Sequence, residues 1–385
     1  MNSSSQRKIA SHYLLTRHGF SSHPLITVCR ATGEILAVEQ YDEASLDSMP
    51  CVEFYAGILC AGFVNAHSHL ELAYLKGAIA EHGGYASFAS SMAAVRNNFA
   101  EQQQLQAIAE ADDAMWKEGV DAVADIVNGA TSFATKSASP IHYHTFAEVF
   151  GLKRCNIAEQ RKLLHNPDTS LTPHSTYSLS DADFKAACEG GDGAPLSIHF
   201  LESEGEKQLY AGCGALHEWY SQVGFECDFL HYGSPVERIV KSVPHDRSVM
   251  LVHNCCLSDS DIDTIMNHFT ASVYWVLCPR SNSYISGVVP HAVSLLRARG
   301  LNICIGTDSL ASNWSLSMVE ELKCFEGVPL DELLGWATLG GAKALGLDDR
   351  LGIIEPGRRC GIVNISGVNL DTMSLTEAAT ARRLL

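Results

Sequence analysis

The feature of this sequence that most constrains its fold is a regular alternation of short apolar runs with longer amphipathic segments. Each run ends on a polar residue, and several of the segments between runs begin with a Ser or Asp suited to capping a helix. Eight repeats of strand and helix predict an α/β protein with a closed (β/α)8 barrel. The eight predicted strands are residues 58–66, 120–126, 141–149, 170–173, 196–200, 249–252, 271–277 and 301–306, and the clearest predicted helices are residues 102–118, 181–189, 258–269 and 291–299.

The two ends of the chain have a different pattern. Residues 10–40 alternate apolar and polar side chains around a turn at Thr32-Gly33, and residues 352–365 place a Pro356-Gly357 turn before an apolar run. Both patterns are typical of antiparallel strands. The 385 residues also exceed the roughly 250 of a single barrel. We therefore expect residues 1–57 and 346–385 to form one small β-sandwich and residues 58–345 to form the barrel.

The composition limits the class of partner. A formal net charge of −17 opposes binding to nucleic acid phosphates or to an anionic membrane surface, and the chain has no stretch of about 18 apolar residues. The thirteen cysteines are odd in number and scattered, which does not indicate a disulfide framework. We expect a cytoplasmic protein that acts on a small molecule and binds neither nucleic acid nor a membrane. Its one candidate oligomer is a homodimer.

The carboxyl ends of the predicted strands concentrate histidine and carboxylate side chains. In a (β/α)8 barrel the reacting groups lie at that end. The first strand ends in His67-Ser68-His69, and because alternate residues of a strand point the same way, both imidazoles would face one point as a ligand pair. The remaining strand-end residues are His174 after the fourth strand, His199 and Glu202 at the fifth, His253 at the sixth and Asp308 at the eighth.

The alternative is that each histidine has a purely structural role. A single histidine at a strand end is usually a hydrogen-bonded core or surface residue, and seventeen histidines make chance placement easier. Chance does not readily put histidine, glutamate and aspartate at the ends of five strands on the functional face of one barrel. We therefore interpret the set as one site.

These motifs resemble those of a known family. Residues 62–72, GFVNAHSHLEL, are similar to the strand-one signature of the amidohydrolase superfamily, and residues 305–309, IGTDS, are similar to its strand-eight signature. With residues 172–174 (TPH), 199–202 (HFLE) and 251–254 (LVHN), the chain resembles the branch that contains cytosine, adenosine-homocysteine and aminofutalosine deaminases and the triazine chlorohydrolases. The motifs span nearly the whole predicted barrel.

The resemblance implies roles at a metal centre for six residues: His67, His69, His199 and Asp308 as ligands, Glu202 as a proton shuttle and His253 as a contact of the attacking water. Three neutral imidazoles and one carboxylate suit one divalent ion, zinc first and iron as the alternative. Such an ion acidifies a water molecule, Asp308 can accept its proton, and Glu202 can donate one to a leaving nitrogen. Members of the family that bind two metal ions commonly use a carboxylated lysine at strand four. Residues 172–178 contain no lysine, so we expect one metal ion.

Three further residues are assigned to the substrate side of the site. Arg280 follows the seventh strand and would stand over the barrel mouth, where it could bind a carboxylate or a ribose-bearing substrate. The alternative is an ion pair between Arg280 and a loop carboxylate. Glu148, at the end of the third strand, either supports a metal-binding histidine or is a plain surface charge. His174 completes this group.

The sequence therefore predicts a metal-dependent hydrolase that deaminates an aminated heterocycle or nucleoside-like small molecule. Hydrolysis of a cyclic amide or of a C–Cl bond by the same activated water is the alternative within the family. A third reading is a non-enzymatic scaffold that has lost its ligands, which the complete ligand set opposes. Specificity resides in the loops, which carry no recognisable motif, so the substrate is left open.

Overall fold

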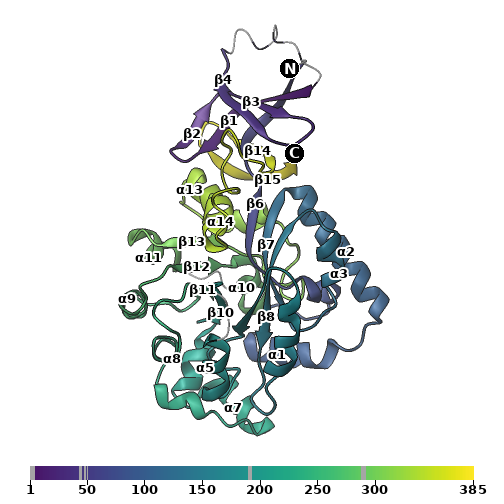
Figure 1. Ribbon diagram of the computed structural model, residues 1–385. Coiled ribbons are helices and arrows are strands. Elements are labelled where there is room, and N and C mark those ends of the chain that lie inside the picture. The colour runs from purple at the N-terminus through teal and green to yellow at the C-terminus, as the bar shows by residue number, and fades with distance from the viewer. Residues whose placement is uncertain (1–4, 43–45, 47–48, 50, 190–192, 288–291) are drawn as a thin grey trace.

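The computed structural model describes residues 5–42, 46, 49, 51–189, 193–287 and 292–385. Within these residues the chain forms a barrel and, at one end of the molecule, a β domain that contains strands from both chain ends (Figure 1). None of the helices in the described ranges is long and apolar enough to cross a membrane.

Eight parallel strands form the barrel as two four-stranded sheets in chain order. The sheets meet at two seams. At one seam the N–H of Asp308 donates to the carbonyl of His67 at 3.0 Å, and at the other the N–H of His199 donates to the carbonyl of His174 at 2.9 Å. The predicted (β/α)8 barrel is confirmed, and both seams pass through residues of the predicted site. The strands are β6 (Phe63–Ser68), β7 (Val120–Val127), β8 (His142–Val149), β9 (Thr169–Pro173), β10 (Leu196–Phe200), β11 (Val249–His253), β12 (Val273–Leu277) and β13 (Asn302–Ile305).

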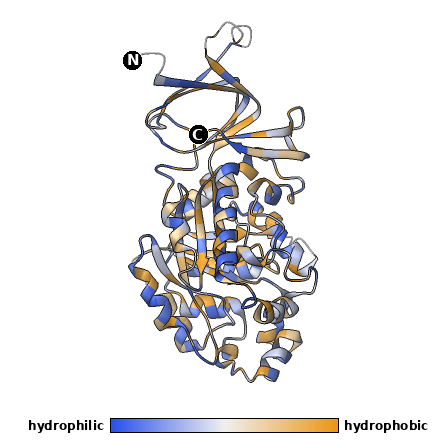
Figure 2. Cartoon of the chain, turned by 90° about the vertical axis from the view of Figure 1, so that its right-hand side faces the viewer, coloured by the Kyte–Doolittle hydropathy of each residue, from blue (hydrophilic) through white to orange (hydrophobic). Residues whose placement is uncertain are grey.

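The barrel strands are hydrophobic because both of their faces are covered. Every residue of β7, β10 and β11 is buried, as expected for parallel strands that have helices outside and packed side chains inside. Figure 2 shows the β domain at one end of the molecule, with the barrel and its helices below it. The polar strand-end residues therefore interrupt an otherwise apolar core.

The helices begin and end at residues whose chemistry explains the boundaries. Ser258 and Asp261 form a capping box at the start of α9, and α2 ends at Gly119, whose φ of 112° favours glycine. The predicted helix 291–299 corresponds to α11, and its first residue lies outside the described residues. The helices are α1 (Tyr85–Val95), α2 (Glu101–Glu118), α3 (Phe133–Ala138), α4 (Ile157–Gln160), α5 (Asp181–Glu189), α6 (Glu204–Tyr210), α7 (Gly214–Val223), α8 (Pro235–Ser242), α9 (Asp259–His268), α10 (Pro279–Ser286), α11 (Ala292–Ala298), α12 (Met318–Leu322), α13 (Leu330–Gly335) and α14 (Gly341–Ala344), with shorter turns η3 (Leu70–Leu75), η4 (Arg161–His165), η5 (Asp228–Tyr232) and η6 (Trp336–Gly340).

The β domain is one continuous seven-stranded sheet in the order β15-β14-β5-β1-β3-β4, with β2 paired to β1. Its strands come from both chain ends, as expected. Most pairs are antiparallel, but β1 and β5 are parallel, and β5 joins the two halves because it also pairs with β14. The strands are β1 (Gln6–Thr16), β2 (Gly19–Ser22), β3 (Pro24–Cys29), β4 (Ile35–Gln40), β5 (Val52–Ala61), β14 (Ile362–Asn369) and β15 (Ser374–Arg383).

The junction between the β domain and the barrel lies inside the predicted first strand. Residues 58–66 are divided between β5 and β6, and the change occurs at Gly62 rather than between residues 57 and 58. A Cβ at Gly62 would lie 2.1 Å from Cγ of Asp121, so only glycine fits there. Asp121 is buried, accepts the N–H of Gly361 at 2.7 Å and pairs with Arg383 at 2.8 Å.

Candidate metal centre

His67 and His69 lie at the carboxyl end of β6, with ring centroids 5.0 Å apart. Asn65, two residues earlier, connects this strand end to the loop after β13. Its side-chain amide donates to Oγ1 of Thr307 at 2.8 Å, and its side-chain oxygen accepts the backbone N–H of Thr307 at 3.2 Å. The next residue of that loop is Asp308, so this connection sets the two histidines opposite a carboxylate.

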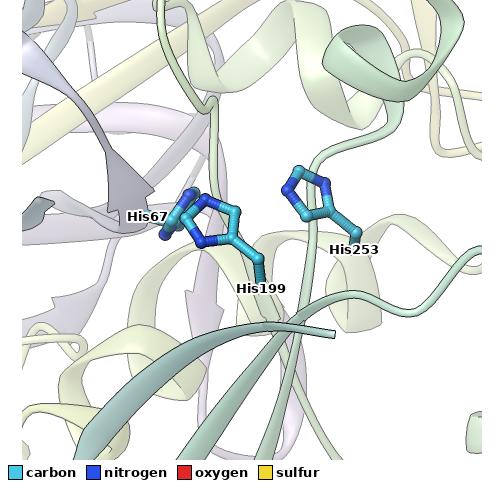
Figure 3. A group of neighbouring side chains, drawn as sticks. All are labelled: His67, His199 and His253. Atoms are coloured by element: carbon cyan, nitrogen blue, oxygen red, sulfur yellow. The ribbon is translucent and has the colours of Figure 1, made fainter. Parts of the chain in front are cut away.

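Four side chains bring their donor atoms to one point. Nε2 of His69 lies 3.3 Å from Nε2 of His199 and 3.5 Å from Oδ1 of Asp308. Nε2 of His67 lies 3.9 Å from the same Asp308 oxygen. Ligand atoms about 2.1 Å from a tetrahedral ion lie about 3.4 Å from one another, so these separations fit one divalent ion. Figure 3 shows His67 and His199 close together, with His253 to one side.

His67 provides an independent test of this fit. Its side chain is fully buried, and neither ring nitrogen has a hydrogen-bond partner in the described part of the chain. Buried polar atoms nearly always have a partner in folded proteins. Burial, followed by the neighbouring His199 and His69, holds the pKa of His67 well below its usual range, so the ring is neutral and can bind a metal through a lone pair. The residues therefore fit a bound divalent cation such as zinc.

Asp308 is fixed by three hydrogen bonds from its neighbours. Oδ2 accepts the hydroxyls of Ser281 at 2.5 Å and Ser312 at 2.9 Å, and Oδ1 accepts the N–H of Ser309 at 2.7 Å. Burial alone would raise the pKa of Asp308. The nearby histidines, of which His69 has the largest effect, outweigh burial and lower that pKa below its usual range. The carboxylate is therefore charged and held in one orientation.

The imidazole ring of His199 is oriented by contacts to its Nδ1, on the side of the ring away from the cluster. Its Nδ1 bonds to the backbone carbonyl of His174 at 2.8 Å, which directs Nε2 toward His69. Oε1 of Glu148 lies 3.7 Å from the same Nδ1, and Oε2 of Glu148 accepts from the side chain of Asn128 at 2.6 Å. The ring of His174 stacks on that of His199 with centroids 4.5 Å apart. Glu148 and His174 thus both contact the far side of His199.

Glu202 and His253 face each other beside the cluster. Oε1 of Glu202 lies 3.8 Å from Nε2 of His253, and Oε2 accepts the hydroxyl of Tyr177 at 3.2 Å. Nδ1 of His253 lies 2.9 Å from the side-chain oxygen of Asn282, which accepts, so Nε2 is left as an acceptor in the neutral ring. Burial, followed by the charge of Asp308, raises the pKa of Glu202 well above its usual range. Burial therefore favours the protonated form of Glu202 more than it does for an exposed glutamate.

Arg280 is directed away from this group. Its Nη1 lies 3.3 Å from Glu320, its Nε donates to Asn313 at 3.2 Å, and its guanidinium lies 5.0 Å from the ring centre of Trp314. Arg280 does not line the cavity at the cluster. This arrangement is an ion pair, as in the alternative that the sequence left open, but its carboxylate lies on α12 rather than in a loop.

A cavity of about 390 Å³ opens directly onto the cluster, a volume in the range of small-molecule sites. Polar side chains gather at its inner end, and aromatic and aliphatic side chains form its walls. The inner residues are His69, Glu148, His174, His199, Glu202 and Asp308, and the larger wall residues are Leu72, Tyr85, Phe88, Met92, Phe150 and Trp219. The cavity therefore gives a small molecule access to the candidate metal site.

Some residues of the site were missed by sequence reasoning. Ser281 and Asn282 directly follow Arg280, in a segment that was considered only for the arginine, yet they hold Asp308 and His253. Tyr177 lies in the segment examined for a lysine, and it contacts Glu202. The signal for the serine and asparagine was their position in the first turn of a helix that follows a barrel strand.

A barrel with three histidines and a carboxylate gathered at the strand ends defines a metal-dependent hydrolase. The Amidohydrolase family matches residues 58–379, and this chain belongs to that family. The resemblance drawn from the strand-end motifs is confirmed, and so is the prediction of a hydrolytic enzyme.

The chain is also similar to curated relatives in sequence and to solved structures in fold. An adenosine deaminase of Helicobacter pylori is 29% identical over 344 residues, 82% of this chain and 80% of the relative. A 5-methylthioadenosine/S-adenosylhomocysteine deaminase of Teredinibacter turnerae is 27% identical over 64% of this chain and 52% of its own length. The structure of Helicobacter pylori aminofutalosine deaminase with methylthio-coformycin has a TM-score of 0.78, with 24% identity over 93% of this chain and 92% of that chain. A zinc-bound adenosine deaminase of Xanthomonas campestris has a TM-score of 0.71, with 22% identity over 96% and 87% of the two chains.

Proposed function

We propose that the protein is a zinc-dependent deaminase that replaces the exocyclic amino group of a purine-like heterocycle, carried on a nucleoside, by oxygen. The observation that carries this proposal is the placement of the buried Glu202 carboxyl opposite His253, next to the four-residue cluster. Relatives named as deaminases of adenosine-type nucleosides support the choice of leaving group and of heterocycle.

His67, His69, His199 and Asp308 would hold the ion, which when bound lowers the pKa of a water molecule so that it can attack at neutral pH. Asp308 accepts the first proton of that water at its carboxylate. Nε2 of His253, an acceptor, orients the attacking oxygen toward the substrate carbon. His199, Asp308 and His253 are already held by protein hydrogen bonds, so little reorganisation of these three side chains accompanies the reaction.

Glu202 supplies the proton that the leaving group needs. The hydroxyl of the water ends on the substrate carbon, the C–N bond breaks, and the amino group leaves as ammonia with the proton from Glu202. The proton held by Asp308 then restores the protonated form of Glu202, so one water is consumed for each ammonia released. Tyr177, which donates to Oε2 of Glu202, fixes the orientation of this carboxyl.

The cavity walls suit the same substrate. Phe88, Phe150 and Trp219 offer aromatic surfaces against which a planar heterocycle can stack. They also limit the access of bulk water to the reacting groups, which strengthens the electrostatic interactions at the cluster.

The test is an ammonia-release screen of the zinc-loaded protein against adenine, guanine, cytosine and their nucleosides. Ammonia release from a purine nucleoside supports the proposal. Chloride release from a chlorinated triazine, or opening of a cyclic amide, without ammonia from any aminated heterocycle would establish the alternative hydrolase instead. Purification without stoichiometric metal would favour the scaffold reading. A cytoplasmic location and a homodimer stay predictions from the sequence.

A further inference from the structure

Glu206 is a buried acid that follows Glu202 by one helical turn. It lies in α6, and only 1% of its surface is exposed. Two cavities reach Glu202, and Glu206 is absent from the described residues that line them. A buried carboxylate is costly unless it is hydrogen-bonded. The role of Glu206 therefore follows from its protein contacts rather than from contact with a ligand.

The two oxygens of Glu206 hold two different loops. Oε2 accepts the backbone N–H of Glu202 at 3.2 Å, in the loop after β10, and Oε1 accepts the hydroxyl of Thr176, in the loop after β9. Thr176 directly precedes Tyr177, whose hydroxyl donates to Oε2 of Glu202. One side chain thus connects the proton donor of the proposed reaction with the residue that orients it.

The backbone before Glu202 has a conformation that needs support. Leu201 has a φ of 49°, in the left-handed region that residues other than glycine rarely adopt. Such a conformation persists only where the surrounding structure holds it. The carbonyl of Leu201 accepts the N–H of Cys255 at 2.8 Å, and the next N–H along the chain is the one that Glu206 accepts. Glu206 therefore stabilises the turn that directs the Glu202 side chain toward His253.

The other loop is itself fixed by buried groups. The carbonyl of Thr176 accepts the hydroxyl of Tyr210 and Nη1 of Arg238, each at 2.6 Å. Arg238 is fully buried between two aromatic rings, and its guanidinium lies 4.4 Å from each ring centre. Through Thr176, Glu206 therefore connects the turn at Glu202 to a well-packed part of the protein.

From these contacts, and resting on the proposed function, we infer that Glu206 is a positioning residue that holds Glu202 and Tyr177 in the orientation needed for proton transfer to the leaving nitrogen. Proton transfer requires hydrogen-bond reach and alignment, and small displacements of the donor slow it steeply. Loss of Glu206 should therefore lower kcat. KM and zinc content should change little, because the cavity walls and the four-residue cluster are formed by other side chains.

Three variants of the zinc-loaded protein test the contacts by ammonia release. Glu206→Met keeps the length of the side chain and removes both acceptor oxygens, so kcat should fall by roughly 10-fold to 100-fold. Glu206→Gln should recover most of this loss, because its amide oxygen can still accept the N–H of Glu202. Thr176→Val removes only the hydroxyl partner and should have a smaller effect. Circular dichroism checks that each variant is folded.

A double-mutant cycle tests whether Glu206 acts through Glu202. In the Glu202→Gln background the proton shuttle is already lost, so Glu206→Met should lower kcat by less than about 2-fold further. A purely structural loss would lower kcat by the same factor in both backgrounds. The matched control is Glu118→Met, because Glu118 also accepts one hydroxyl, from Ser317, and one N–H, from Val319. It lies at the end of α2, next to the amino end of β7, and its effect should be the same in both backgrounds.

Hydrogen exchange gives a readout that does not depend on turnover. The Glu202 amide should exchange faster in Glu206→Met than in the wild type, because it loses its acceptor. Mass spectrometry of peptides that cover residues 200–206 measures this change. In Glu118→Met the same peptides should exchange at the wild-type rate.

The outcomes separate the two proposals. Wild-type kcat in Glu206→Met, equal losses in both backgrounds of the cycle, or unchanged exchange at Glu202 overturns the inference and leaves the deaminase intact. If Glu206→Met does not fold, the cycle and the exchange measurement with Thr176→Val decide in the same way. If the wild-type protein releases ammonia from no compound, the proposed function fails, and the exchange measurement still decides whether Glu206 holds Glu202.

Discussion

Nε2 of His69 and Nε2 of His199 lie 3.3 Å apart, although the two residues are 130 positions apart in the chain and occupy different sheets of the barrel. Two imidazole nitrogens at this distance are held by one shared proton or by a cation between them. Oδ1 of Asp308 lies 3.5 Å from the same His69 nitrogen. A cation satisfies all three atoms at once, whereas one proton cannot.

Replacing His67 by Asn should deplete zinc and activity together. The substitution removes a fully buried donor whose nitrogens have no described protein partner, so three ligands remain. Zinc affinity should fall by about 100-fold or more. Zinc per chain is measured by mass spectrometry after dialysis. His18→Asn, at an exposed position of the β domain, is the control. Full zinc occupancy in His67→Asn would remove His67 from the ligand set.

Replacing Glu202 by Gln should separate metal binding from turnover. Gln keeps the shape and can still accept from Tyr177, but it cannot give up a proton. Zinc content should match the wild type, while kcat falls by a factor on the order of 10² to 10⁴. Glu39→Gln, at an exposed position of β4, should leave both unchanged. The shuttle role is lost if Glu202→Gln turns over at the wild-type rate.

Replacing Glu148 by Gln should weaken zinc binding without abolishing it. Glu148 contacts His199 on the side away from the cluster, and such outer partners typically contribute 10-fold to 100-fold to metal affinity. Competition with a chromogenic chelator measures the dissociation constant. Glu101→Gln on α2 is the matched control, because Glu101 is exposed. An unchanged dissociation constant together with a raised KM would instead assign Glu148 to the substrate.

Replacing Asp121 by Asn should destabilise the junction between the β domain and the barrel. The change leaves the buried Arg383 guanidinium without its anion, and breaking such a pair costs about 3 to 5 kcal/mol. The urea midpoint should fall, whereas zinc content under native conditions should not. A midpoint within error of the wild type would show that the pair contributes nothing to stability.

The pH dependence of stability should contain a contribution from Glu321. Burial raises the pKa of this side chain from 4.5 to about 8, although the N–H of Arg280 and the amide of Asn313 donate to it. The unfolded chain loses the proton first, so the free energy of unfolding should decrease as pH rises from about 4.5 toward 8. Urea midpoints across this range should be flatter for Glu321→Gln. Parallel curves for the two proteins would contradict the assignment.

The parts of the fold that the sequence predicted best depend on local pattern. Residues 181–189 and 196–200 match α5 and β10 because helix and strand periodicity are read within a single element. The strand-end positions of the candidate residues followed from two local facts, that strand neighbours alternate and that barrel strands end at the active face, whereas the ligand set came from the resemblance to the family. His67, His69, His199 and Asp308 lie close together in the structure, and their assignment as metal ligands stays a prediction.

The parts that were not predicted depend on contacts between distant segments. The strand break at Gly62 arises because Asp121 and Gly361 pack against it from elsewhere in the chain. Arg280 could be placed near the barrel mouth from sequence, but its pairing with Glu320 depends on where α12 lies.

The place of β5 in its sheet has a consequence for how the chain is made. One edge of β5 can pair with β1 soon after both leave the ribosome, but the other edge waits for β14, which follows nearly the whole barrel. Until then an open strand edge is exposed in the nascent protein, and such edges promote association between chains. The edge of β5 stays open even after all the barrel strands have emerged. The yield of folded protein should therefore be sensitive to translation speed and to chaperones that shield strand edges.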